Sequence, residues 1–199
     1  MDTSLIAKSL SGVLALSLAG CVSVLPEPTA ADALYRIDAP EMRQTLAQNL
    51  IIREPEAPQI VAGQALVSED ASGAIRLIPS VEWAGRSTRQ LQLALVDSFS
   101  VDGEGAAILP ETGASAGFEL SSRVQNFELR GSEAVCAISV ALLEGRSRRL
   151  VEQGEVLVRQ VADSDKVADR AKQMKAAAEQ CVAEVSAFAA AALNERTGN

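Results

Sequence analysis

The cysteines carry the most specific chemistry in this chain of 199 residues. The first of the three ends the segment Leu18-Ala19-Gly20-Cys21, which has the order of a bacterial lipobox. The apolar run before it, residues 10–18, is about half of the roughly 20 apolar residues that span a bilayer, so it predicts a cleaved secretory signal over residues 1–20. The Cys21 thiol would then receive a diacylglycerol and its new amine an acyl chain such as palmitate. Several buried chains give stable attachment, which predicts an anchored protein.

The residues after Cys21 indicate where such an anchor would hold the protein. Val22, instead of Asp, follows the cysteine, which favours the outer membrane over retention in the inner membrane, with the chain facing the periplasm. Residues 21–32 are small and polar and include Pro26 and Pro28. This composition predicts a flexible tether of up to roughly 35 Å.

Cys136 and Cys181 remain as a pair in an exported chain, where disulfides form and persist. Cys136 shares the bulkier side of an alternating segment, residues 134–142, with Ile138 and Val140. Cys181 lies on the apolar side of a C-terminal helical pattern, so both thiols point to one interior. We expect either a Cys136–Cys181 disulfide that links this helix to the sheet, or two separate buried thiols.

Composition argues against catalysis, metal binding and nucleic-acid binding. The chain has no histidine, which removes the usual general base and the commonest metal ligand. Its carboxylate pairs, such as Glu54 with Glu56, lie near prolines or helix starts, and Gly103-Glu104-Gly105 lacks the context of a phosphate-binding loop. The formal charge of −8 and the 3% aromatic content do not suit nucleic acid. We therefore expect no catalytic residues, no metal and no cofactor.

Hydrophobic patterns predict an α+β domain over residues 33–195, with an antiparallel sheet on which a short middle helix and a long C-terminal helix pack. A Ser87-x-x-Gln90 capping box predicts a middle helix of about 12 residues. The C-terminal helix is expected over residues 164–195, on its own sheet and not on another chain. The expected strands are 34–37, 50–52, a hairpin of 59–68 and 74–83 with Pro79 at an edge or bulge, a weak strand at 106–109, and a meander of 117–129, 133–143 and 149–161. The C-terminal helix is expected to bury Val167, Ala171, Met174, Ala178, Cys181, Val185, Phe188 and Ala192.

The order of these segments resembles the ABC-type transport auxiliary lipoproteins, of which the paraquat-inducible protein C type is best known. The resemblance rests on the lipobox, on Tyr35-Arg36-Ile37-Asp38-Ala39-Pro40, on Val81-Glu82-Trp83-Ala84 and on the helix around residues 91–97. It covers nearly all of residues 33–193. Gly85 departs from a family position that is often acidic.

The resemblance implies an accessory role in moving lipid or another hydrophobic compound between membranes. The implied partners are a mammalian-cell-entry-domain protein, an ABC permease and an ATPase, and a homo-oligomer is also implied. The chain would dock proteins and do no chemistry of its own. Two alternatives remain open from the residues: a structural or assembly lipoprotein that braces an envelope complex without handling cargo, and a carboxylate-only periplasmic enzyme.

Overall fold

The computed structural model describes residues 30–197, which form one compact unit from Ala31 onward. The predicted signal over 1–20, the lipobox with Cys21 and most of the predicted tether lie outside the described residues. The elements, in chain order, are β1 (Ala33–Tyr35), β2 (Leu50–Ile52), α1 (Gln59–Ala62), β3 (Ala65–Glu69), β4 (Ile75–Trp83), α2 (Ser87–Asp97), β5 (Ala107–Ile108), the 3-10 turn η1 (Pro110–Thr112), β6 (Phe118–Arg130), β7 (Glu133–Glu144), β8 (Leu150–Val161) and α3 (Val167–Thr197).

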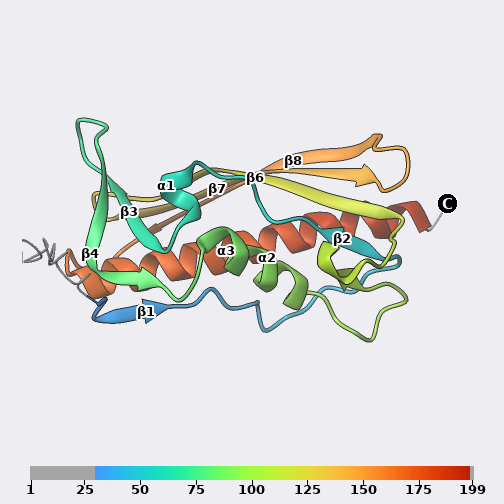
Figure 1. Cartoon of the computed structure of the whole chain (residues 1–199), viewed down its shortest axis with the longest axis horizontal. Helices are drawn as coiled ribbons and strands as arrows, with labels where there is room; N and C mark the ends of the chain where they lie inside the picture. Colours follow the sequence, from blue (N-terminus) through green and yellow to red (C-terminus); the bar gives the residue numbers. More distant parts are fainter. Residues whose placement is uncertain (1–29, 198–199) are drawn as a thin grey trace, which may run out of the picture. The chain divides into compact units, whose positions relative to one another are not determined.

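The strands form an eight-stranded sheet whose largest part is the antiparallel meander β6-β7-β8. Along the other edge of β6, β2 pairs with its first residues and β3 pairs with its last residues. β5 then lies beside β2, and β4 and β1 continue the sheet beyond β3. Figure 1 shows the meander on one side of α3 and β1 on the other, so the sheet wraps around this helix.

The α+β class and the helix-covered sheet are confirmed, but the sheet is mixed and not wholly antiparallel. The pairs β3/β4, β6/β7 and β7/β8 are antiparallel, whereas β1/β4, β2/β5, β2/β6 and β3/β6 are parallel. Parallel neighbours need long crossover connections. Here residues 53–117 connect β2 to β6, and residues 70–117 connect β3 to β6. Local patterns within such strands do not reveal which distant strand each one pairs with.

β4 changes direction in its middle, as the expected edge or bulge at Pro79 requires. The next residue, Ser80, has a positive φ of 67°. The pairing with β3 is interrupted there, because Val67 lies opposite Leu77 while Ala65 lies opposite Glu82. The first half of β4 therefore pairs with β3 as a hairpin, and its last residues pair with β1.

The helix α3 is the centre of the core and lies on its own sheet, as predicted. Its expected stripe is buried from Ala171 to Ala192, with two differences: Val167 is 37% exposed and Phe188 is only partly buried. Phe188 lies against Gly154, where a Cβ atom would come within 2.9 Å of its ring. By length and hydropathy, residues 167–196 could span a membrane, but 56% of the best stretch is buried inside the domain. In this structure α3 is a core helix.

Two local predictions are wrong. Residues 59–62, expected to begin a strand, form α1, and β3 starts only at Ala65. The capping box is absent, because Ser87 is the first helical residue and its hydroxyl donates to Val61 O (2.5 Å). Gln90 instead accepts a hydrogen bond from the Ile37 backbone N–H (2.9 Å) and donates to Gly85 O (3.0 Å). Ser87 and Gln90 thus fix α2 to Val61 and Ile37, which are adjacent in space but distant in the sequence.

A candidate docking surface on the meander

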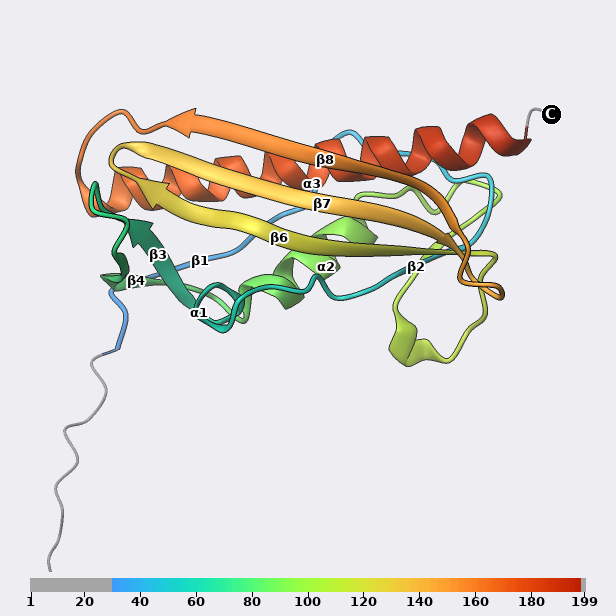
Figure 2. The ribbon, with the colours of Figure 1, turned by 90° about the horizontal axis from the view of Figure 1, so that it is seen from above.

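The outer face of β6-β7-β8 is turned away from α3, and no described helix covers it. Along β7, Cys136, Ile138, Val140 and Leu142 are buried toward α3, so the residues between them point outward. Figure 2, seen from above, shows the three strands in front and α3 behind them. Ala137 is buried on this face, but Ser139 and Ala141 are partly exposed, so the part of the meander around them is available to another molecule.

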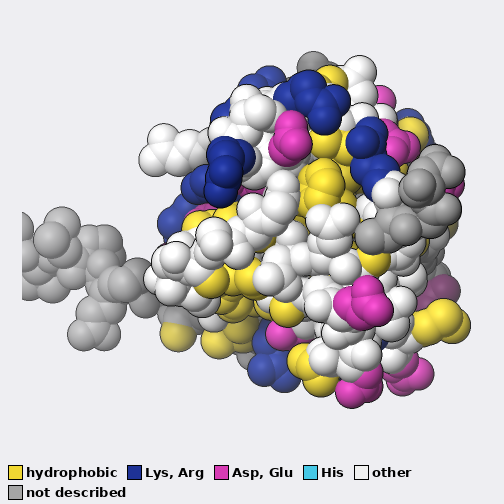
Figure 3. Space-filling model, turned by 90° about the vertical axis from the view of Figure 1, so that its right-hand side faces the viewer, with side chains coloured by type: hydrophobic (Ala, Val, Ile, Leu, Met, Phe, Trp, Pro, Cys, Tyr) yellow, Lys and Arg dark blue, Asp and Glu magenta, His cyan; other side chains and the backbone are white. Residues whose placement is uncertain are grey.

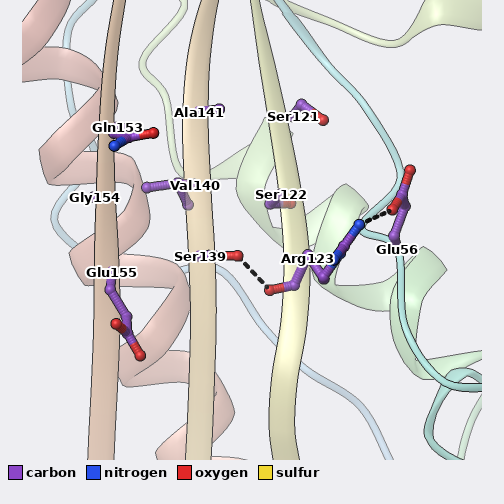
Figure 4. Close-up of a pocket in the computed structure, with 10 residues that line it drawn as sticks. All are labelled: Glu56, Ser121, Ser122, Arg123, Ser139, Val140, Ala141, Gln153, Gly154 and Glu155. Atoms are coloured by element: carbon purple, nitrogen blue, oxygen red, sulfur yellow. Dashed lines mark hydrogen bonds and ion pairs between the residues drawn. The ribbon is translucent and has the colours of Figure 1, made fainter.

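Small side chains hollow the middle of this face. Ser121 on β6 lies directly opposite Ala141 on β7, and Ser139 is the next outward residue of β7. Around them a cavity of about 630 Å³ opens, with Gln153 and Glu155 of β8 on its far side. Figure 4 shows these residues spread across the three strands. The hollow results from the small side chains of Ser121, Ser139 and Ala141, which longer side chains of β6 and β8 surround.

Charged groups flank the hollow without filling it. The Arg123 guanidinium pairs with the Glu56 carboxylate at 3.3 Å, and both side chains are mostly exposed. The Ser139 hydroxyl donates to the Arg123 carbonyl at 3.4 Å. Seven of the ten lining residues are polar or charged. Acyl chains are bound by predominantly apolar cavities, so this hollow suits the polar surface of a protein and not a lipid tail.

A second cavity, of about 970 Å³, lies at the end of the domain where β2, β6 and the β7–β8 turn meet. Figure 3 views the domain from this end and shows arginine or lysine side chains gathered in its upper half. The lining includes Arg53, Arg146 and Arg148, but also three glutamates. Glu119 is 3% exposed, accepts a hydrogen bond from Arg53 (2.7 Å) and pairs with Arg148. These opposite charges connect three parts of the chain, which is a structural role.

Burial raises the pKa of the Glu119 carboxyl, but hydrogen bonds from Arg53 and Arg148 outweigh it and hold this pKa below its usual 4.5. Sequence reasoning missed this cluster. The alternation of β6 places Glu119 on the outward side, but nothing local reveals that two distant arginines cover it.

Of the other residues singled out from the sequence, the structure brings one pair together and separates the rest. Cys136 and Cys181 meet between β7 and α3 and are paired as a disulfide, with Cα atoms 6.4 Å apart. Glu54 binds Arg86 (2.8 Å) and the Thr88 hydroxyl, whereas Glu56 binds Arg123, so these carboxylates do not form a pair. Gly105 lies against the backbone of Gln48 in a close chain crossing. Among residues 30–197 no three His, Cys, Asp or Glu side chains gather as metal ligands.

A family model described as "ABC-type transport auxiliary lipoprotein component" matches residues 33–186. The chain belongs to this family. The match runs from β1 into α3 and so includes the whole sheet. Membership in a lipoprotein family implies an anchored, envelope-side location and association with ABC transport systems. The family is one of auxiliary components and not of enzymes.

Solved structures confirm the fold. A protein from Xanthomonas campestris has a TM-score of 0.70 at 19% identity, with 85% of this chain and 99% of that chain covered. A further structure, of an uncharacterized protein, has a TM-score of 0.62 at 15% identity, with 80% of this chain and 99% of that chain covered. At these identities the likeness concerns the fold alone. No curated protein matches the chain.

Proposed function

We propose that this protein is the lipid-anchored accessory component of an ABC-type system that moves lipid or another hydrophobic compound between membranes. Its partners would be a mammalian-cell-entry-domain protein with its permease and ATPase, and its anchor would lie in the outer membrane. The family match supports the link to ABC transport. The open polar face of the meander supports a role in docking proteins.

The lining of the cavities is the observation that favours docking over carrying cargo. Both large cavities are lined mainly by polar and charged residues, including four arginines and five glutamates in total. A lipid tail placed in either one would take these groups out of water, which is costly even for those that are ion-paired. A protein surface can supply hydrogen bonds and charges to match them. The transported compound would therefore pass through a partner and not through this domain.

A pull-down of the full-length lipoprotein from its own cells in mild detergent, with cross-linking and mass spectrometry, tests this proposal. We expect a mammalian-cell-entry-domain protein, a permease and an ATPase, with cross-links to the meander. An Ala141→Trp variant, which fills the hollow, should lose most of that recovery. Leu77→Trp, at a position that is 57% exposed on β4, is the matched control. Recovery of only envelope scaffolding proteins would favour a bracing role instead.

A further inference from the structure

β8 is an exposed edge of the sheet. It extends from Leu150 to Val161, pairs with β7 on one side and has no strand partner among the described residues on the other. Figure 2 shows it as the border of the meander. Natural edge strands are usually short or carry proline or lysine to prevent further pairing. β8 has 12 residues and contains neither proline nor lysine, and its charged side chains are Glu152, Glu155 and Arg159. The Val151 carbonyl accepts a hydrogen bond from Arg196 (3.5 Å), so the part of the edge after this residue is the part able to accept another strand.

The outward side chains of β8 carry opposite charges at equal distances on the two sides of Leu157. Leu157 is 51% exposed, with Glu155 two residues before it and Arg159 two residues after it. Within the described part of the chain, the Glu155 carboxylate has no ion-pair partner, while Arg159 pairs with Glu133 at 2.9 Å. An acid and a base at equal distances from a central apolar residue make this strand complementary to its own reversed copy.

We propose that β8 pairs antiparallel with β8 of a second copy, with the two-fold axis at Leu157. In this register Glu155 of each copy lies opposite Arg159 of the other, and opposite charges at such positions attract. On the face toward α3, Val156 lies opposite Val158. A register centred on Glu155 or on Arg159 would bring like charges together. A register shifted by one residue would place the outward side chains of one β8 opposite the inward side chains of the other.

Such a contact is isologous, so it closes as a dimer and leaves no further β8 edge. One strand pair buries less surface than the roughly 1,200 Å² of a stable interface. The dimer should therefore be weak in dilute solution and strong where two copies share one membrane, because anchoring raises their effective concentration. The contact goes beyond the proposed transport role, and its failure would leave the pull-down result unaffected.

Cysteine cross-linking in cells that make the full-length lipoprotein tests the register. Leu157→Cys should give a covalent dimer on a non-reducing gel, because directly opposite Cβ atoms lie about 5 Å apart. Gln153→Cys is the matched control, since its two copies would be separated by about 27 Å along the strands. Gln153→Cys and Val161→Cys made together should cross-link to each other. Equal cross-linking of Leu157→Cys and Gln153→Cys would overturn the proposal.

Charge reversal provides a second test within the Leu157→Cys background. Glu155→Arg should lower the dimer yield about tenfold, because both ion pairs become repulsive. Arg159→Glu should do the same. When the two variants are made together, each opposite pair is again acid with base, so the mixed dimer should return to the wild-type yield. A mixed dimer no more abundant than either single-variant dimer would contradict the Glu155–Arg159 contact.

Discussion

The Arg53 guanidinium lies 2.7 Å from the carboxylate of Glu119, whose side chain is 4% exposed, and so joins β2 and the segment after it to β6. Arg148, from the β7–β8 turn, binds the same carboxylate. Both arginines remain about half exposed and therefore keep contact with water. The Glu119 carboxylate is buried, so hydrogen bonds from the two arginines replace water around its charge. The cluster should therefore contribute a measurable, pH-dependent part of the stability.

Glu119→Gln should lower the free energy of unfolding by about 1–2 kcal/mol at pH 7, since it removes a charge that two arginines stabilise. Because the pKa of Glu119 is lowered in the folded state, its contribution is present above the ordinary pKa of 4.5 and is lost as the pH falls through the lower folded value. Urea unfolding at several pH values should show the difference from wild type shrinking below pH 4.5. The exposed Glu41→Gln is the control, and a pH-independent difference would contradict this assignment.

The Cys136–Cys181 disulfide is tested by counting thiols in the denatured, unreduced protein. We expect none, because the proposed lipid anchor would occupy the Cys21 thiol, and two free thiols would disprove the bond. The cysteines are 45 residues apart, so reduction should lower the free energy of unfolding by about 3–4 kcal/mol in the chain-entropy model. A Cys136→Ala/Cys181→Ala variant should unfold at the same urea concentration with and without reductant.

Gly105→Ala should destabilise the domain by about 1–3 kcal/mol through overpacking. A Cβ atom at Gly105 would lie 2.2 Å from the Gln48 backbone, where the two segments form a bridge. Gly63→Ala is the matched control, because a Cβ atom there meets nothing within 4 Å. Chemical denaturation of both variants measures the effect, and equal stabilities would show that the crossing can open without cost.

Cys21→Ser should abolish lipid attachment and leave the protein with its signal uncleaved, because the lipobox requires the thiol. Incorporation of labelled palmitate, together with the mass of the N-terminal peptide, measures this. The Cys136→Ala/Cys181→Ala variant should label like wild type. Labelling of Cys21→Ser would place the anchor at another residue.

Much of the fold could be predicted from the sequence because the signals are local. The three long strands alternate with period two, and α3 buries one stripe, so turns and side-chain faces follow from spacing alone. The same spacing places Cys136 and Cys181 on the apolar faces of their elements, but it leaves open whether they pair, and the structure shows the disulfide. Residues 59–62 form a helical turn and not the expected strand, and composition does not separate the two because a single helical turn and a short strand use similar residues.

The sequence by itself determined the kind of protein, the class of fold and the faces that form the core, because these depend on residue type and on periods of two or 3.6 residues. Only the tertiary structure decided that β2 and β3 share an edge of β6, that Glu119 meets Arg53 and Arg148, and that β8 borders the sheet. These relations join segments tens of residues apart. They arise from the packing of the whole chain around α3, which no local pattern encodes.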